Sequence, residues 1–498
     1  MRFDFPQVYR AYLACRRKKR NKPSALAFEL NHEESLVELA VELRERRYQP
    51  GVSICFYTKK PKAREIFAAA FRDRIVHHLI YAVLAPVWER VFIQHSYACR
   101  PGKGTHAAAQ ALQRFLRQLT ANGTRRAYYL KLDVKNFFMT IDRRKLFEML
   151  AARCHDPELL WLLRVVVFHD PTSNYEMQDR DNLRRALPPH KSLFHAQPFC
   201  GLPIGNLTSQ FFANVYLNAL DQFVKHELKC RYYLRFVDDF VLLAESLEQL
   251  REWQAAITAF LAEKLALALN PRATRLAPVS GGVDFAGFIV RPHYMLVRRR
   301  VLGNLKAKLR MARRQLIVRA TTYCAYRFHE ETLADCRAAL NSYLGHFRHA
   351  QTRRCVKKLW QEFSWLERFF VLSSRKVTRR DEPLRRKPRL NAQVHWERRN
   401  FKKHVVLVQL GCYYEAFNTS AEVLAKALNL HLKQNWRGFA CACGFPQKML
   451  LPMLAELKKQ RVPLVLLRET GREGRHAKQR ALHLILEYPE LIPPAPLS

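Results

Sequence analysis

The stretch YYLRFVDDFVLLA, residues 232–244, decides the fold, because it places two adjacent carboxylates between two apolar segments. The aromatic and aliphatic residues of these segments predict two strands joined by a turn at Asp238 and Asp239. Two neighbouring anions with apolar flanks repel each other unless a cation lies between them. A metal site at the turn would meet that need, and the alternative is an ordinary β-turn that uses Asp for its turn propensity.

A third carboxylate stands at the end of another expected strand. The segment YYLKLD, residues 128–133, is apolar and aromatic and ends at Asp133. If both segments belong to one sheet, Asp133 can meet the pair at Asp238 and Asp239. The three carboxylates would then offer oxygen ligands for two Mg²⁺ ions, or for Mn²⁺, as two-metal phosphoryl transfer requires.

The composition indicates a folded protein that binds a polyanion. The chain has 498 residues, 49% of them hydrophobic, and its 85 Lys and Arg exceed its 43 Asp and Glu to give a net charge of +42. Such an excess repels itself in a compact fold unless phosphates offset it. Nucleic acid is therefore the expected partner, and an anionic membrane surface is less favoured.

The cysteines and the N-terminal segment point to a cytoplasmic protein. Twelve cysteines are present, but only Cys441 and Cys443 lie close together, and no second pair completes a zinc site. We expect reduced thiols rather than disulfides. The N-terminal segment lacks the apolar stretch of a signal peptide, and no run of about 18 apolar residues predicts a membrane span.

Changes in pattern divide the chain into six expected segments of mixed α/β class. Residues 291–319 contain ten Lys or Arg and no acid, and the basic stretch before residue 404 has little apolar content, which predicts a linker. The last globular part alternates strands and helices and is expected to close with a helix over HAKQRALHLILEY. The segments are a helical extension at 1–50, an α/β core at 51–290, a basic helical segment at 291–372, a linker at 373–403, a small α/β domain at 404–488 and a tail at 489–498.

Four segments together resemble the motifs of reverse transcriptases in order and spacing. They are LKLDVKNFF, GLPIGNLTSQFFANVYLNALD, YLRFVDDFVLLA and VDFAGF, and AREIFAAAFRDRIVHHLIYAVLAPVWERVF resembles the fingers of the bacterial, group II intron-like branch. The resemblance covers residues 50–350. It implies a right-hand polymerase with fingers and palm at 51–290 and a thumb at 291–372. It also implies that a bacterial or phage-encoded enzyme copies template RNA into cDNA from deoxynucleotides.

The same resemblance implies roles for individual residues. Asp133, Asp238 and Asp239 correspond to the catalytic aspartates, and Phe138 to the bulky gate that excludes a 2′-hydroxyl; the alternative for Phe138 is a plain core aromatic. Basic residues of the fingers contact the triphosphate or form a solvated basic face. The implied metal ligands are Asp133, Val134, Asp238 and Asp239, and the implied nucleotide-binding residues are Lys59, Lys62, Arg64, Phe137, Phe138, Gly205 and Gln210. The implied primer grip is Phe285, Gly287 and Phe288, and the nucleic-acid-binding thumb cations are Arg298, Arg299, Arg300, Lys306, Arg310, Arg313 and Arg314.

Two departures from the intron-type pattern narrow the resemblance. Many intron-type enzymes carry Gln-Gly and Ser-Pro where this chain has Ile204-Gly205 and Ser209-Gln210. This pattern and the string NSYLGHFRHA are similar to the reverse transcriptases of diversity-generating retroelements. That likeness implies errors at template adenines and a small basic accessory protein.

The C-terminal part resembles a different family. The segments QLGCYYEAFNTSAEVLAKALNLHL and CGFPQKMLLPMLAELKKQRVPLVLLRE are similar to the N-terminal mismatch-recognition domain of the MutS proteins. Tyr413 stands at the position of the wedging aromatic, and Glu415 at that of the acid that bonds the mispaired base. Tyr413 and Tyr414 could alternatively be ordinary aromatics at the end of a strand.

Three functions remain open at this level. The first is a retroelement reverse transcriptase of the diversity-generating type, and the second an intron-associated or antiviral-defence reverse transcriptase. The third is a catalytically silent RNA-binding protein on a polymerase scaffold. The intact set of Asp133, Asp238 and Asp239 argues against the third.

Overall fold

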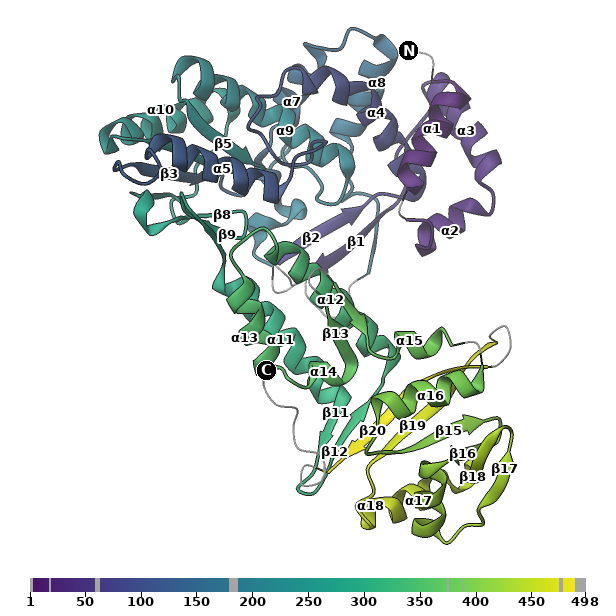
Figure 1. The fold of residues 1–498 in the computed structure, drawn as a ribbon. Coiled ribbons are helices and arrows are strands. Elements are labelled where there is room, and N and C mark those ends of the chain that lie inside the picture. The colour runs from purple at the N-terminus through teal and green to yellow at the C-terminus, as the bar shows by residue number, and fades with distance from the viewer. Residues whose placement is uncertain are drawn as a thin grey trace. The chain divides into compact units, whose positions relative to one another are not determined.

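The computed structural model describes residues 3–17, 19–58, 63–178, 187–373, 376–387, 389–473 and 478–488. The chain divides into two compact units, 1–295 and 296–498, which run from purple to teal and from green to yellow in Figure 1. Among the described helices none is long and apolar enough to cross a membrane. All twelve cysteines are free thiols, and seven of them are buried.

Helices open the first unit, as the periodicity of its sequence predicts. The buried side chains of α1, Val8, Ala11, Tyr12 and Cys15, follow helical spacing and join the core of this unit. A long helix, α4, packs against α1 and contains Pro86. The helices here are α1 (Phe5–Arg16), α2 (Pro23–Glu29), α3 (His32–Arg44) and α4 (Phe71–Glu89), and the strands β1 (Ser53–Thr58), β2 (Arg64–Ala68) and β4 (Tyr175–Met177) form a small sheet in the order β2-β1-β4.

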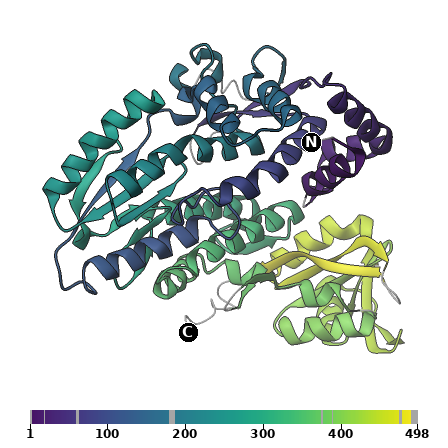
Figure 2. The same ribbon diagram turned by 90° about the horizontal axis from the view of Figure 1, so that it is seen from above.

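A four-stranded sheet in the order β5-β6-β3-β7 lies at the centre of the first unit. Its strands are β3 (Tyr128–Asp133), β5 (Tyr232–Phe236), β6 (Asp239–Ala244) and β7 (Arg275–Pro278), all antiparallel to their neighbours. Phe240 and Leu242 of β6 face the core that contains α9 (Leu207–Gln222) and α10 (Leu247–Leu265). Helix α5 (Thr105–Leu119) contacts β5 and β6 from the other side, so the sheet lies between helices (Figure 2).

The remaining elements of the first unit surround this sheet. Around VDFAGF the structure forms a hairpin. Ala286 and Gly287 both have positive φ, 49° and 91°, as a two-residue hairpin turn requires. The elements are α6 (Phe137–Thr140), α7 (Arg143–Ala151), α8 (Pro157–Phe168), a π-helical turn at Phe223–Glu227, β8 (Val283–Phe285) and β9 (Phe288–Val290), with β10 (Met295–Val297) at the boundary of the units.

In the second unit the segment of basic helices and the C-terminal strands share an eight-stranded sheet and a hydrophobic core. Strand β12 pairs with β20, Cys324 opposite Glu487, and so joins the expected thumb to the expected C-terminal domain. Leu305 and Leu309 of α11 share a core with Val408 and Phe417. The sheet order is β11-β12-β20-β19-β15-β16-β18-β17. The strands are β11 (Ile317–Arg319), β12 (Cys324–Arg327), β15 (Val405–Leu410), β16 (Tyr413–Phe417), β17 (Lys433–Trp436), β18 (Phe439–Pro446), β19 (Leu464–Glu473) and β20 (Lys478–Glu487), and the helices are α11 (Arg299–Leu316), α12 (Glu330–Phe347), α13 (Arg353–Glu362), α14 (Leu366–Phe369), α17 (Thr419–Leu428) and α18 (Leu450–Lys459).

Two sequence predictions for the second unit are wrong. The expected linker at 373–403 contains β14 (Val377–Arg379), which pairs with β13 (Phe370–Leu372), and two helices, α15 (Glu382–Arg385) and α16 (Leu390–Asn400). Its few apolar residues, Val377 and Leu384 among them, are buried in the core, and its Arg379 is buried in an ion pair with Asp381. The segment expected to form the last helix is instead the strand β20. It pairs along one edge with β19 and along the other with β12, and its apolar run has no distinct period.

Candidate active site

The three aspartates of the predicted metal site come together at one end of the central sheet. Asp133 ends β3 and lies directly opposite Asp239, the first residue of β6. Asp238 precedes it in the turn from β5, and the Asp238 carbonyl accepts a hydrogen bond of 3.2 Å from the Val134 amide. Antiparallel pairing of β3 with β6 therefore brings together acids that are far apart in the sequence.

Two neighbours that the motif analysis did not identify hold these carboxylates. The Lys131 ammonium lies 3.0 Å from Asp239 Oδ2 and also donates, at 3.0 Å, to the main-chain carbonyl of Asp284 beside the β8–β9 hairpin. Asn270 donates from its side chain to Asp133 Oδ2 at 3.1 Å. Lys131 could have been found, because it is a lone cation inside an apolar strand and lies two residues from Asp133. Asn270 gave no such signal.

Burial raises the pKa of Asp239 to about 6. The nearby Lys131 ammonium opposes this shift, whereas the carboxylates of Asp133 and Asp238 add to it. The side chain of Asp239 is 27% exposed, yet its Oδ1 atom is buried without a hydrogen-bond partner. A buried carboxylate oxygen without a donor is costly unless a cation meets it. A divalent cation would satisfy this oxygen, although among the described residues no group of three or more His, Cys, Asp or Glu is arranged so that it could hold a metal ion.

The predicted gate residue, Phe138, follows Asp133 in the chain by five residues. Asn136 adopts a left-handed conformation, φ 51°, which starts the short helix α6 directly after β3. Phe137 is buried, whereas Phe138 is half-buried against Phe137, with ring centroids 5.5 Å apart. The Leu202 amide donates to the Phe138 carbonyl at 2.7 Å. Phe137 is thus a core residue, and Phe138 keeps part of its ring accessible.

The loop after Leu202 is tied to the fingers strand β2. The Phe67 amide donates to the Ile204 carbonyl at 2.9 Å, and a Cβ atom on Gly205 would lie 2.8 Å from the Phe67 carbonyl oxygen. Glycine is required there, also because its φ is 132°. Gln210 is exposed and its amide oxygen accepts from the Cys99 thiol at 3.1 Å.

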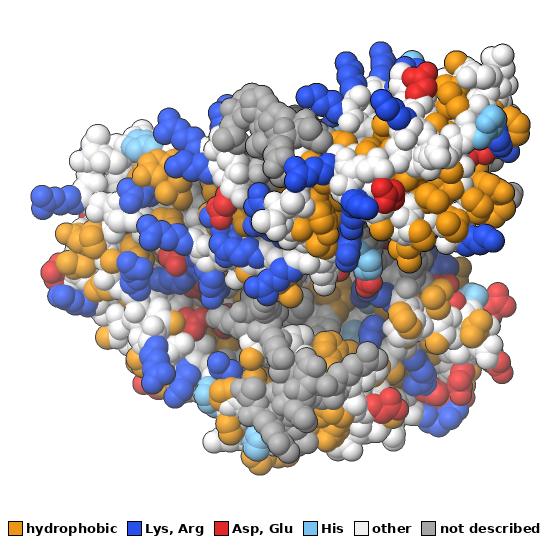
Figure 3. All heavy atoms as spheres, turned by 90° about the horizontal axis from the view of Figure 1, so that it is seen from below, with side chains coloured by type: hydrophobic (Ala, Val, Ile, Leu, Met, Phe, Trp, Pro, Cys, Tyr) orange, Lys and Arg blue, Asp and Glu red, His pale blue; other side chains and the backbone are white. Residues whose placement is uncertain are grey.

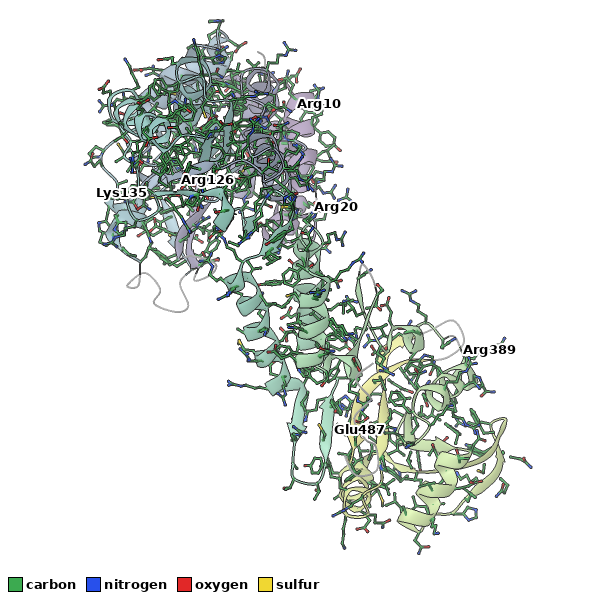
Figure 4. All side chains as sticks on the ribbon, turned by 60° about the vertical axis from the view of Figure 1, so that its left-hand side comes forward. Arg10, Arg20, Arg126, Lys135, Arg389 and Glu487 are labelled. Atoms are coloured by element: carbon green, nitrogen blue, oxygen red, sulfur yellow. The ribbon has the colours of Figure 1, made fainter. Side chains whose placement is uncertain are left out.

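The other predicted nucleotide and primer contacts differ in accessibility. Arg64, in β2, is exposed, while Lys59 and Lys62 lie outside the described residues. Phe285 and Phe288 are wholly buried, so they can support a primer grip only through the backbone around Gly287. Lys135, labelled in Figure 4, is exposed two residues beyond Asp133.

Cations cover the outer side of α11 in the second unit. Leu305, Leu309, Ala312 and Leu316 face the core. Lys306 and Arg310 share Glu362 as an acidic partner, at 2.5 and 3.7 Å. The exposed cations of this helix are Arg299, Arg300, Lys308, Arg310, Arg313 and Arg314, whereas Lys306 and the N-cap residue Arg298 are half-buried. Lys and Arg outnumber Asp and Glu on the face of the molecule drawn in Figure 3.

A second candidate site lies at the start of β16, next to the turn formed by Gly411 and Cys412. Tyr413 and Glu415 are on the same side of the strand, opposite Pro446 and Gly444, and Tyr413 is 45% exposed. Tyr414 points to the other side and is wholly buried. Tyr414 is therefore a core aromatic, whereas Tyr413 is available for stacking.

A buried charge network holds this turn. Glu469 accepts from the Gly411 amide at 3.1 Å and from the Arg480 guanidinium at 3.0 Å. Arg480 also donates to Gln393 at 3.0 Å. Nearby on α16, Glu397 is 1% exposed, and both its oxygens lack a hydrogen-bond partner. Burial raises the pKa of Glu397 well above its usual range, with Arg480 opposing the shift.

We expect Glu397→Gln to change how the stability of the protein depends on pH. The carboxyl is protonated in the folded chain at pH values where the unfolded chain is ionised, so folding takes up a proton. The free energy of unfolding of the wild type should then fall by up to about 1.4 kcal/mol per pH unit above the ordinary glutamate pKa. Chemical unfolding at pH 5 and pH 8 measures this, with exposed Glu331→Gln as control. Parallel pH profiles for wild type and Glu397→Gln would contradict it.

Two parts of the chain are similar to known families. Residues 57–290 match the family model of reverse transcriptase (RNA-dependent DNA polymerase), and residues 389–473 match that of MutS domain I. Residues 57–290, of mixed α/β fold, are thus similar to reverse transcriptases, and residues 389–473 to MutS domain I, as the resemblances imply. The second match begins inside the expected linker.

Several curated proteins are similar to part of the chain. Protein YkfC of Escherichia coli is 26% identical over 308 residues, which cover 54% of this chain and 74% of that protein. The group II intron-encoded protein LtrA of Lactococcus lactis is 24% identical over 195 residues, 39% of this chain and 28% of LtrA. An uncharacterized 91 kDa protein in the cob intron of Schizosaccharomyces pombe is 24% identical, over 38% of this chain and 20% of that protein. The chain therefore spans less than a third of these two intron proteins.

Two telomerase structures are also partly similar. That of Candida tropicalis matches with a TM-score of 0.36 and 14% identity, over 50% of this chain and 55% of the other. That of Candida albicans with a telomeric RNA fragment matches with a TM-score of 0.37 and 11% identity, over 61% and 56%.

Proposed function

We propose that the protein is an RNA-directed DNA polymerase that works by two-metal nucleotidyl transfer. The observation that carries this proposal is the register of the central sheet, which sets Asp133 against Asp239 with Asp238 in the adjoining turn. The match of residues 57–290 to the reverse transcriptase model supports it. Primer extension on an RNA template tests it, as set out in the Discussion.

The aspartates would hold the metal, together with the main chain at Val134. Bound Mg²⁺ or Mn²⁺ lowers the pKa of the primer 3′-hydroxyl and neutralises charge on the triphosphate and the departing pyrophosphate. Asn270 fixes the Asp133 carboxylate by its hydrogen bond. The Lys131 ammonium links Asp239 to the β8–β9 hairpin, so the expected primer grip and the metal site share one cation.

The nucleotide would lie between the sheet and the fingers. Phe138, which is half-buried, would pack under the sugar, and Gly205 allows the loop to approach Phe67 closely. The exposed side chains of Arg64 and Gln210 are free of the core and available to triphosphate and template. Template RNA, the RNA–DNA hybrid and deoxynucleotides are the proposed partners.

The finer assignment is to the diversity-generating type. It rests on Ile204 and Gln210. Ile204 stands where many intron-type enzymes carry Gln, so this chain lacks a hydrogen-bonding amide near the templating pair, and such an amide would help base selection. A small basic accessory protein belongs to this proposal. An intron-associated or defence role is the alternative, and the likeness to LtrA favours it. Errors concentrated at template adenines in cDNA would distinguish the first role from the second.

The C-terminal domain is proposed to bind distorted duplex. Its exposed Tyr413 and the neighbouring Glu415 stand where the MutS family has its wedge and its acid, and the matched residues 389–473 include both. A tyrosine can stack on a base as a wedge does.

Replacing Tyr413 and Glu415 together by Ala should weaken binding to a mismatched RNA–DNA hybrid about tenfold, because a stacked base is lost. Binding isotherms for mismatched and matched hybrids of one length measure the effect, and primer extension on a simple template should stay intact. Leu451→Ala, an exposed apolar change on α18, is the control. If the double variant binds both hybrids as the wild type does, the domain is not a mismatch reader and a docking role is favoured.

A further inference from the structure

A buried arginine lies next to the turn formed by Val237 and Asp238, called the aspartate turn below. Close packing of apolar side chains does not account for a charged residue there. Arg235, in the apolar strand β5, is wholly buried, and so is Asp221 of α9. The guanidinium donates twice to the Asp221 carboxylate, from Nε at 2.8 Å and from Nη2 at 2.6 Å. The Tyr233 hydroxyl donates to the same carboxylate at 2.7 Å. A buried ion pair contributes little net stability compared with apolar side chains of the same volume.

The remaining donor nitrogen of Arg235 reaches the aspartate turn itself. Nη1 donates to the main-chain carbonyl of Val237 at 2.9 Å and to Asn214 Oδ1 at 3.2 Å. Val237 has a φ of 59°, a left-handed conformation that β-branched residues avoid. A backbone held in such a conformation needs surrounding contacts that fix it, and Arg235 supplies one at the strained residue.

The position of Arg235 is fixed from its other side. Its amide donates to the His95 carbonyl, and its own carbonyl accepts from the Tyr97 amide, both at 2.9 Å. The segment around Ser96 therefore pairs with the edge of β5 at this residue. The strand, the guanidinium and the turn form one connected unit that ends at Asp238.

We propose that Arg235 is a positioning residue for the metal site: with Asp221 it holds Val237 in the left-handed turn that directs Asp238 towards Asp133 and Asp239. This inference rests on the proposed polymerase function. Without the bond to its carbonyl, Val237 would relax towards an ordinary conformation and carry Asp238 out of place. The metal would then bind weakly although all three aspartates remain.

The test is Mn²⁺ binding to the full chain, followed by electron paramagnetic resonance, together with the Mg²⁺ dependence of primer extension. Arg235→Met should weaken Mn²⁺ binding about 10- to 100-fold, as loss of a group that orients a ligand does. Its affinity for a template–primer duplex without metal should stay within about twofold, since the phosphate contacts lie elsewhere. Arg235→Lys keeps the buried charge but not the fork geometry, and should also weaken Mn²⁺ binding.

Two further variants separate positioning from plain structural support. Adding Val237→Gly to Arg235→Met should restore most of the Mn²⁺ affinity, because glycine adopts a φ of 59° without strain. Tyr233→Phe removes a hydroxyl from the same buried network but not from the turn, and should leave Mn²⁺ binding unchanged.

Wild-type Mn²⁺ affinity in both Arg235 variants would overturn the proposal. So would a loss that Val237→Gly does not repair, or an equal loss in Tyr233→Phe. If Arg235→Met does not fold, Mn²⁺ binding is compared instead between Arg235→Lys and the double variant that adds Val237→Gly to it. A wild type that binds Mn²⁺ but never extends a primer would refute the polymerase function while leaving the role of Arg235 in metal binding measurable.

Discussion

Asp238→Ala should abolish primer extension, lowering its rate by about a thousandfold or more, because a metal site that loses one of its few anionic ligands no longer stabilises the charge of the transition state. Asp238 is in the turn rather than in the core, so the protein should remain folded. Single-nucleotide addition to a DNA primer on an RNA template measures the rate. The circular dichroism spectrum and the unfolding temperature report the fold.

The matched control is Glu245→Ala, which removes an exposed carboxylate just beyond the far end of β6. It should extend primers as the wild type does. Asp133→Ala combined with Asp238→Ala should be no slower than either change alone, because groups that act as one unit are not additive. Substantial primer extension by Asp238→Ala would show that Asp238 is not part of a catalytic metal site.

Phe138→Ala should open the enzyme to ribonucleotides. If the ring lies beneath the sugar, its removal leaves room for a 2′-hydroxyl, and the preference for deoxynucleotides should fall about 100-fold. The measurement is the ratio of kcat/KM for each deoxynucleotide to that for its ribonucleotide.

Phe137→Leu serves as the control for Phe138→Ala. Phe137 is buried next to Phe138, so a change there should lower stability without admitting ribonucleotides. If Phe138→Ala retains the wild-type preference, Phe138 is a core aromatic and another residue sets sugar selection. If both variants lose the preference equally, the effect comes from general loosening of the segment.

The centre of the fold could be predicted because its signals are local. The aromatic and aliphatic runs on either side of Asp238 and Asp239 predicted β5 and β6, and the run ending at Asp133 predicted β3, as the structure shows. The spacing of apolar residues likewise predicted the N-terminal helices. Short-range periodicity determines such elements, so no knowledge of distant contacts was needed.

The second unit could not be predicted in the same way, since its structure depends on contacts between distant segments. Glu397 and Gln393 lie in a stretch whose composition resembles a linker, yet both are buried. Strand β20 is a strand only because β12 and β19 pair with it from both sides. Composition averages over such a stretch and cannot show that a few of its residues complete a core.

In the candidate site, too, residues in local motifs could be predicted, whereas residues that act through distant contacts could not. The aspartates were visible as motifs, but Asn270 and Asp221 act across long sequence separations, and nothing near them signals this. Arg235 did carry a signal, since a charged residue in an apolar strand must find a partner when buried. The sequence shows that Arg235 needs a partner if it is buried, but only the fold identifies the Asp221 carboxylate and the Val237 carbonyl as its partners.

The most direct test of the central claim is RNA-templated DNA synthesis by the purified wild-type chain. A DNA primer annealed to a defined RNA is incubated with deoxynucleotides and Mg²⁺, and the product is sequenced. The account predicts DNA complementary to the RNA, and no product when the metal is chelated. A chain that binds the template–primer tightly but adds no nucleotide with either Mg²⁺ or Mn²⁺ would contradict it and leave a silent RNA-binding protein.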